Sequence, residues 1–312
     1  MKVLVTGGAG FIGSHVVAAY RAAGHDVAVV DTLVTGRAEH LPDGVRLYRV
    51  DITDPGLDEV FARERPEVVN HHAAQASVTA SVRDPAADAR VNVLGTINVL
   101  EQARRAGVRR FLFASTGGAL YGEPEAIPVG LDHPVRPLSP YGAAKAAAET
   151  YVALYERLFG LPAVILRYAN VYGPHQDPHG EAGVVAIFAE AMLAGRAPTI
   201  HGDGTQTRDF VYVEDVARLN VLVTERALAG VFHVATGVEV RVNEIHERLA
   251  ALTGYAGAPQ HGPPRPGEVY RIALDPSETV RRLGWRAAVS LEEGLRRTVE
   301  WFRARAAPGH AR

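Results

Sequence analysis

Short apolar runs alternate with amphipathic segments along the first half of the chain. The apolar runs have the length of buried strands and lie at KVLVTG (2–7), DVAVVD (26–31), VRLYRV (45–50), EVVNHHAA (67–74), RRFLFAST (109–116) and PAVILRYANVYG (162–173). The segments between them predict helices over 11–24, 56–65, 85–106 and 140–159. Because apolar strands separated by helices are buried on both faces, the pattern indicates an α/β fold with a doubly wound parallel sheet.

The alternation becomes less regular after residue 174. Helices are predicted near 182–195, 213–227, 242–253 and 289–305, among loops rich in Gly and Pro. We therefore expect a large domain over 1–174 that carries the cofactor. A smaller C-terminal α/β lobe over 175–312 is expected to bind the substrate, with some of its chain crossing back to the large domain.

Composition excludes several classes of function. The net charge of -2 provides no basic surface for nucleic acid. The chain has no cysteine, which excludes thiolate catalysis and thiolate metal sites. No apolar run reaches the roughly 18 residues of a membrane span, and glycines interrupt the N-terminal MKVLVTGGAG too early for a signal peptide. We expect a cytoplasmic protein with neither a membrane nor a nucleic-acid partner.

A glycine-rich turn follows the first apolar run. The stretch TGGAGFIG places Gly7, Gly10 and Gly13 between a predicted strand and a predicted helix, where a pyrophosphate can approach the helix N-terminus. Asp31 ends the next predicted strand, 18 residues after Gly13. Its carboxylate suits the two hydroxyls of a ribose and repels a 2′-phosphate. The turn therefore predicts a Rossmann-type site for NAD rather than NADP.

The stretch SPYGAAKAAAETY (139–151) contains one of only two lysines in the chain, against 31 arginines. Ser139 and Pro140 are typical of an N-cap and a first helical residue, which places Tyr141 and Lys145 one turn apart on one face. The pKa of a phenol must fall about three units for Tyr141 to act as a base near neutrality. That fall corresponds to roughly 4 kcal/mol, of which one cation about 5 Å away supplies about 3 kcal/mol at an effective dielectric near 20. A bound nicotinamide cation and the helix dipole add to it, so the stabilisation is sufficient in magnitude.

Six segments together resemble the extended short-chain dehydrogenase/reductase family. They are TGGAGFIG (6–13), STGGALYG (115–122), YGAAK (141–145), RYANVYGP (167–174), GDGTQTRDFVYVEDVA (202–217) and RPGE (265–268). Within that family the chain is most similar to bacterial UDP-glucose 4-epimerases, over essentially its whole length. The resemblance implies that Tyr141 is the catalytic base and acid, that Lys145 is its partner and ribose anchor, and that Thr116 bonds the reacting sugar oxygen. Ser115 remains an alternative to Thr116.

The resemblance also implies contacts with NAD and with a UDP-sugar. Cofactor contacts are expected from Gly7, Gly10, Phe11, Ile12, Gly13, Asp31, Thr32, Gly36, Arg37, Asp51, Ile52, His72, Ala73, Ala74, Gln75, Asn92, Ala114, Tyr141, Lys145 and Tyr168. Substrate contacts are expected from Ser77, Val78, Thr116, Asn170, Val185, Arg208, Arg265, Glu268 and Ile272. Asp51 and Ile52 end the third predicted strand, at the place of an adenine edge. The arginines suit a pyrophosphate on chemical grounds alone, and Glu268 can accept from ribose hydroxyls.

The expected reaction is NAD-dependent 4-epimerisation of a UDP-hexose. Tyr141 takes the proton of the 4-hydroxyl as hydride leaves C4, and the hydride then returns to the opposite face. The alternative is another nucleotide-sugar enzyme of the same family, such as a 4,6-dehydratase or decarboxylase. Those relatives carry an acid where Gly117 follows Thr116 here. A catalytically idle scaffold would normally lack Tyr141 or Lys145.

Substrate range and assembly are also implied by the resemblance. Ile272 stands at the position of a gatekeeper tyrosine, and its smaller side chain implies some tolerance of UDP-N-acetyl sugars. A homodimer through the helices near 86–106 and 140–159 is expected from the family.

No metal site is expected. His71 and His72 are adjacent, so a strand would direct them to opposite faces, which is poor geometry for chelation. The stretch PHQDPHG (174–180) has the alternating histidines of a metal loop, but it follows NVYGP directly. We interpret it as a loop that covers the substrate.

Overall fold

A seven-stranded parallel sheet forms the centre of the computed structural model, which describes residues 1–179 and 183–306. The strand order is β11-β6-β5-β4-β1-β2-β3. The strands are β1 (Lys2–Thr6), β2 (Asp26–Val30), β3 (Arg46–Tyr48), β4 (Val68–His71), β5 (Arg110–Thr116), β6 (Ala163–Tyr168) and β11 (Gly230–Val234). The order reverses between β1 and β4, and ligands of open α/β sheets bind at the carboxyl ends of strands beside such a reversal.

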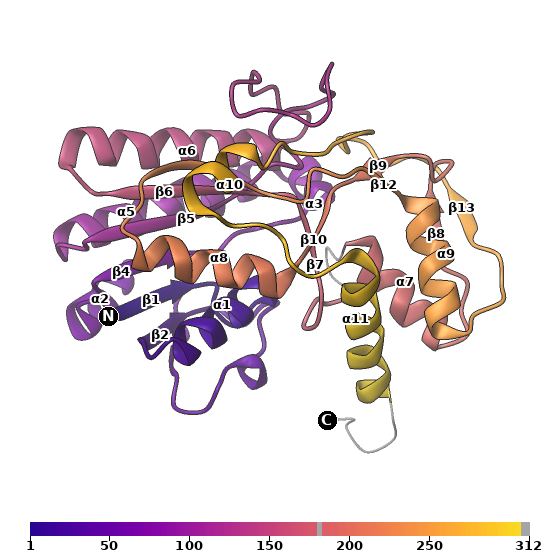
Figure 1. Cartoon of the computed structure of the whole chain (residues 1–312). Helices are drawn as coiled ribbons and strands as arrows, with labels where there is room; N and C mark the ends of the chain where they lie inside the picture. Colours follow the sequence, from indigo (N-terminus) through magenta and orange to yellow (C-terminus); the bar gives the residue numbers. More distant parts are fainter. Residues whose placement is uncertain (180–182, 307–312) are drawn as a thin grey trace.

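Helices cover both faces of this sheet (Figure 1). Helices α1 (Phe11–Ala22) and α8 (Val213–Glu225) pack on one face, together with Val3 and Val5 of β1. The other face packs Leu4 of β1 against α2 (Leu57–Glu64), α5 (Thr96–Arg105) and α6 (Pro140–Phe159). Successive residues of β1 thus enter opposite cores, as a strand period of two requires. The predicted doubly wound sheet is confirmed.

The later part of the chain forms a smaller lobe beside the sheet. Its core packs α7 (Val184–Leu193), α9 (Val242–Thr253) and α11 (Leu291–Ala306), which lie together at the right of Figure 1. Short strand pairs complete it: β7 (Asn170–Tyr172) with β10 (Phe210–Tyr212), β8 (Thr199–His201) with β13 (Gln260–Gly262), and β9 (Thr207–Arg208) with β12 (Val240–Arg241). Helix α8 packs on the large sheet and strand β11 belongs to it, although both follow residue 174. The domain boundary at residue 174 stays a prediction.

The predicted helix over 85–106 is divided into three parts. It comprises α4 (Pro85–Ala89), a π-helical turn η2 (Arg90–Gly95) and α5. The wide turn contains Asn92, whose side chain bonds a neighbouring loop, and such π-turns are frequent at functional sites. Sequence periodicity could not show this turn, because it changes the helical repeat for only one turn.

Several short elements were not predicted. These are α3 (Val78–Arg83), α10 (Ser277–Leu283) and the 3-10 turn η1 (Ala38–His40), each too short for a periodic signal. Strand β3 ends at Tyr48, so the prediction that Asp51 and Ile52 end this strand is wrong. In the described part of the chain, no helix has the length and apolar content needed to span a membrane.

Three histidines and a tryptophan connect the two lobes. The ring of His175, in the loop after β7, stacks on His40 with centroids 4.0 Å apart and lies 4.6 Å from the ring of His15 on α1. The ring of Trp301 on α11 lies 5.6 Å from that of His175. Burial lowers the pKa of all three imidazoles, to about 4 for His40 and about 3 for His175. The loop 174–180 is predicted to cover the substrate, and its residue His175 packs between the two lobes. Gly180 of this loop lies outside the described residues.

This cluster predicts loss of stability in acid. An unfolded chain protonates histidine near pH 6.5, whereas the folded chain keeps His40 and His175 neutral to about pH 4, so the unfolded state binds more protons in that interval. The free energy of unfolding should therefore fall between pH 6.5 and pH 4, by up to about 1.4 kcal/mol per pH unit for each ring. His40→Phe should make the fall shallower in denaturant titrations. His179→Phe, at a side chain 70% exposed, is the control, and parallel curves for all three proteins would contradict the prediction.

Candidate active site

The turn between β1 and α1 has the geometry of a dinucleotide site. Gly7 has a φ of 67°, and a Cβ there would lie 2.5 Å from the backbone nitrogen of Ala73. A Cβ on Gly13 would overlap the carbonyl of Gly7. Helix α1 begins at Phe11 after Gly10, which has no side chain to cap the first N–H groups. The turn therefore presents free, oriented N–H groups to which a pyrophosphate can come close.

Asp31 follows β2 directly and is fixed against this turn. Its Oδ2 accepts a hydrogen bond of 3.0 Å from the Ala9 nitrogen, and its Oδ1 accepts one of 2.8 Å from the Leu33 nitrogen. A Cβ on Gly36 would lie 2.8 Å from the same Oδ1, so only glycine fits there. Each carboxylate oxygen can accept a second bond, which fits the ribose hydroxyls of NAD.

The other expected contacts around the adenosine differ in exposure. Thr32 is partly buried, and the Arg37 nitrogen bonds the Ala9 carbonyl at 2.9 Å, which closes this loop over the turn. The exposed Asp51 accepts two bonds of 2.8 Å from Thr53, while Ile52 is 4% exposed. Ile52 thus packs in the core, and contacts of Asp51 and Ile52 with adenine stay predictions.

The loop after β4 is tied to the π-turn. Asn92 accepts a bond of 3.0 Å from the Gln75 nitrogen and donates one of 2.8 Å to the Gln75 carbonyl. These two bonds hold the segment that contains Ala73 and Ala74 at the carboxyl end of β4. Ser77, which follows, caps α3 by accepting a bond from the Ala80 nitrogen at 2.7 Å, with Val78 as the first helical residue.

His71 and His72 have separate partners, as the strand period predicts. His71 is 1% exposed and bonds Thr6 at 2.6 Å and Thr96 at 3.0 Å. His72 Nε2 lies 3.1 Å from the hydroxyl of Tyr168. In residues 1–179 and 183–306 no three His, Asp or Glu side chains are grouped as metal ligands.

Helix α6 brings Tyr141 and Lys145 to the end of β5. Its bounds match the predicted 140–159, because Ser139 caps its start with a bond of 3.2 Å from the Gly142 nitrogen and Gly160 ends it at a φ of 65°. Lys145 is 4% exposed, and its Nζ donates a bond of 3.0 Å to the Ala114 carbonyl. Burial lowers the pKa of Lys145 to about 8.

Thr116 and Ser115 point to different surroundings. Thr116 lies close enough to the phenol of Tyr141 for its hydroxyl to lower the pKa of that phenol. Ser115 is 4% exposed and donates a bond of 2.5 Å to Glu149, whose carboxylate is also held by Arg167 at 2.6 Å. Successive residues of a strand face opposite sides, so only Thr116 is placed beside Tyr141.

The pKa of Tyr141 is raised in the protein without NAD, and the expected fall, which includes the charge of the bound nicotinamide, stays a prediction. Burial, and after it the negative charge of Asp88, raise the pKa of Tyr141 to about 12, although the neighbouring Thr116 hydroxyl acts in the opposite direction. The Lys145 ammonium bonds the strand and lies 4.8 Å from the centroid of the Phe113 ring. Asp88 was not predicted, because a single acid within PAADAR gives no signal of its burial.

Space beside Thr116 depends on two glycines. A Cβ on Gly118 would lie 3.4 Å from Oδ1 of Asn170 and 3.9 Å from Oγ1 of Thr116, so these two expected substrate contacts border the same space. A Cβ on Gly117 would collide with the fully buried side chain of Leu274. A larger residue therefore cannot occupy position 117 without displacing the core.

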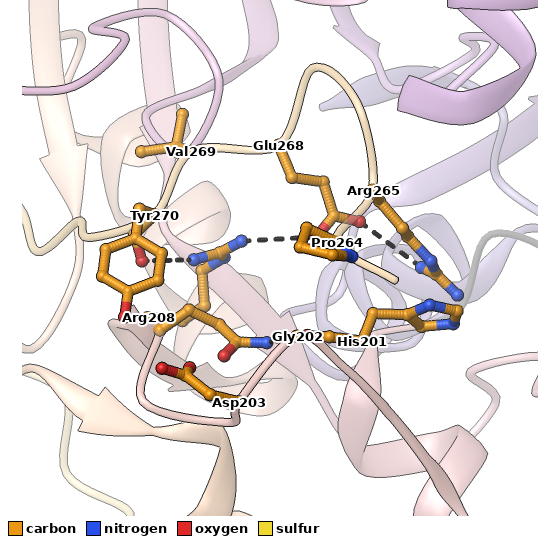
Figure 2. A pocket seen from close by; sticks show the side chains of 10 residues that line it. His201, Gly202, Asp203, Arg208, Pro264, Arg265, Glu268, Val269 and Tyr270 are labelled. Atoms are coloured by element: carbon orange, nitrogen blue, oxygen red, sulfur yellow. Dashed lines mark hydrogen bonds and ion pairs between the residues drawn. The ribbon is translucent and has the colours of Figure 1, made fainter. Parts of the chain in front are cut away.

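Three of the predicted substrate residues line one pocket of about 330 Å³ (Figure 2). Glu268 lies between two cations, with its oxygens 3.6 Å from Arg208 and 3.4 Å from Arg265. Arg208 also donates to the Tyr270 carbonyl at 3.2 Å, and burial lowers its pKa. The pocket joins residues from β9 and from the loop after β13, and its paired guanidinium groups suit a diphosphate.

Val185 and Ile272, which were also expected to contact the substrate, do not line this pocket. Val185 is fully buried in the core of the small lobe, and Ile272 is 2% exposed in the core of the large sheet. Their contacts with substrate stay predictions.

Comparison with known proteins agrees with this site. The sequence model of the NAD dependent epimerase/dehydratase family matches residues 3–235. A UDP-glucose 4-epimerase of Mycolicibacterium smegmatis is 48% identical over 309 residues, which cover 97% of this chain and 99% of that protein. Two solved structures each cover 97% of this chain and 99% of theirs. UDP-glucose 4-epimerase with UDP-glucose from Thermotoga maritima is 48% identical at a TM-score of 0.94, and the Thermus thermophilus enzyme in complex with NAD is 49% identical at 0.93. The chain belongs to the NAD dependent epimerase/dehydratase family, and its cofactor is NAD.

Proposed function

We propose that this enzyme is a UDP-glucose 4-epimerase that interconverts UDP-glucose and UDP-galactose. The observation that carries the proposal is the placement of Tyr141 beside Thr116 at the end of β5, where the buried Lys145 bonds Ala114. Two hydroxyls meet there at the carboxyl end of β5, where a sugar hydroxyl can bond both. The relatives of 46–49% identity that carry this name support the choice of substrate.

The residues of the chain divide the reaction between them. NAD, when bound, accepts a hydride from C4 of the sugar and returns it to the opposite face. Tyr141 accepts the proton of the 4-hydroxyl as the hydride leaves and gives it back on return, while Thr116 holds the same oxygen. Because burial raises the pKa of Tyr141, its phenolate needs the positive charges of Lys145 and of the bound nicotinamide.

The diphosphate end of the substrate is proposed to bind Arg208 and Arg265. Glu268 already orients both guanidinium groups, so little side-chain freedom is lost when an anion binds. An anchored diphosphate leaves the hexose free to turn between the two hydride transfers. Glu268 is proposed to accept from the uridine ribose.

The packing of Leu274 against Gly117 argues against the alternative function of a 4,6-dehydratase. Those relatives need an acid after the threonine, and here a Cβ at Gly117 would strike Leu274. The acid that those relatives are expected to use on C5 and C6 is therefore missing at position 117. Tolerance of UDP-N-acetyl sugars stays a prediction, since Ile272 lies in the core and a tyrosine there would overpack it.

We further propose that the enzyme is a homodimer and acts in the cytoplasm. Apolar side chains are exposed on the two helical segments expected at the interface: Leu94 at 60%, Leu158 at 63% and Phe159 at 50%. Exposed apolar groups on neighbouring helices are typical of an interaction surface. The cytoplasmic location is supported by a sequence without cysteine.

Incubation with UDP-galactose should yield UDP-glucose with no net formation of NADH, measured by chromatography and by absorbance at 340 nm. Tyr141→Phe should lower kcat by about 10³-fold, because the only proton acceptor at the 4-hydroxyl is removed. Tyr151→Phe, on the exposed side of the same helix, is the control and should retain full activity. A 4-keto-6-deoxy product, or normal turnover of Tyr141→Phe, would refute the proposal.

Substitutions at Ser115 and Thr116 should have opposite effects. Thr116→Val should lower kcat by about 10²-fold and leave thermal unfolding nearly unchanged, because a hydroxyl that bonds the reacting oxygen is lost. Ser115→Ala should retain kcat and destabilise the fold by about 1–3 kcal/mol, because Glu149 loses a buried donor. Steady-state kinetics and calorimetry on both variants measure this, and the reverse pattern would assign the catalytic hydroxyl to Ser115.

The double substitution Leu158→Glu and Phe159→Glu should convert a dimer to a monomer in sedimentation equilibrium, because four charges would face each other across the interface. Val238→Glu replaces an apolar side chain 57% exposed on the loop before β12 and should leave the dimer intact. A wild-type monomer, or an unchanged double variant, would contradict the proposed interface.

A further inference from the structure

Asp88 on α4 is a buried acid that none of the assigned roles explains. It is 1% exposed, although aspartate is almost never fully buried unless paired. Its Oδ1 accepts bonds from Gln75 at 2.6 Å and Asn92 at 3.0 Å. Its Oδ2 is buried and has no hydrogen-bond partner within residues 1–179 and 183–306.

The two residues that Asp88 bonds hold the loop after β4. Gln75 and Asn92 exchange two further bonds through the backbone of Gln75. The Gln75 side chain also donates to the Ser77 carbonyl at 3.0 Å and accepts from the Ser77 nitrogen at 2.5 Å. One carboxylate oxygen therefore anchors a closed network, and this network carries residues expected beside the nicotinamide and the sugar.

The second oxygen of Asp88 is free to act through its charge. Helix α4 packs against α6, the helix that carries Tyr141 and Lys145. The Lys145 ammonium is buried and donates only the bond to Ala114 among the described residues, so two of its three donors are unused. A buried charge without compensation is strongly destabilising, and these two opposite charges lie on packed helices.

We propose that Asp88 is a positioning residue of the epimerase, which anchors Gln75 and Asn92 through one oxygen and sets the charge around Tyr141 and Lys145 through the other. The role rests on the proposed function. The negative charge keeps Lys145 protonated and keeps the phenol of Tyr141 protonated until a positive charge binds beside it. In this way the acid favours the proton-donating form of Tyr141, which the second half of the reaction needs.

Titratable groups other than Asp88 also lie around Tyr141 and Lys145. Glu149 also raises the pKa of Lys145, but its carboxylate is held by Arg167. His71 and His72 face Lys145 from β4 and the residue after it, and burial keeps both imidazoles neutral by lowering their pKa values. Asp88 is therefore the acid in this part of the site with an oxygen that is not already bonded.

The test removes the charge of Asp88 and keeps its shape. In the NAD-loaded Asp88→Asn enzyme, the phenol of Tyr141 should ionise at a pH at least half a unit lower, because the charge that opposes the phenolate is gone. The phenolate absorbs near 295 nm, and subtraction of the Tyr141→Phe titration isolates its signal. The acid limb of the kcat/KM profile with UDP-galactose should move to lower pH by the same amount.

The controls separate charge from anchoring and from the proposed function. Asp84→Asn removes an exposed charge from the N-cap of the same helix and should leave the titration unchanged. Asp88→Ala should also raise KM, since the network around Gln75 loses its anchor, whereas Asp88→Asn retains an acceptor oxygen. The absorbance titration needs no sugar, so it tests Asp88 even if wild-type enzyme fails to convert UDP-galactose.

An unchanged phenol titration in Asp88→Asn would overturn the proposal. Asp88→Ser provides a smaller uncharged acceptor if the amide prevents folding, and the same downward shift is expected of it. If neither variant folds while Asp84→Asn does, Asp88 is a structural residue only and the proposal is wrong.

Discussion

The packing of α6 against β5 is the contact on which the site depends. The bond from the Lys145 ammonium to the Ala114 carbonyl ties the helix to the strand at 3.0 Å. Because Tyr141 lies one turn before Lys145 and Thr116 lies two residues after Ala114, this one contact brings both hydroxyls together. The serine cap and the glycine stop of α6 fix which residues face the strand. A shift of α6 by one residue would turn Tyr141 away from Thr116.

Burial changes the pKa values of Tyr141 and Lys145 in directions that oppose the proposed proton transfer. A phenol in a low-dielectric pocket holds its proton more firmly, and an ammonium there releases its proton more easily. The two shifts act against a tyrosinate–lysine pair in the protein alone. In the proposed mechanism, the positive nicotinamide ring of bound NAD would shift this balance toward the phenolate and so couple proton transfer to cofactor binding. Such coupling suits an enzyme that must keep its cofactor through a complete cycle.

The sugar and the diphosphate of the substrate are proposed to bind different parts of the fold. In the proposed mechanism, Thr116 of β5 and Tyr141 of α6 bond the sugar, and the small lobe carries the arginine pair that suits the diphosphate. The stacked histidines around His175 lie where the lobes meet, close to the start of α1. The same interface therefore joins the dinucleotide turn to the loop that precedes α7.

The sequence alone determined those features that depend on neighbours along the chain. The glycine turn, the bounds of α6 and the parallel sheet follow from capping, backbone freedom and hydrophobic period, all of which are local. Only the tertiary structure showed that Thr116 lies beside Tyr141 while Ser115 bonds Glu149, brought Arg208 beside Arg265, buried Asp88 and placed Ile272 in the core. These outcomes depend on contacts between distant segments, and no short pattern records which charge is buried beside which. The raised pKa of Tyr141 in the protein without NAD has the same origin, since burial and Asp88 raise it and no pattern in the sequence shows either.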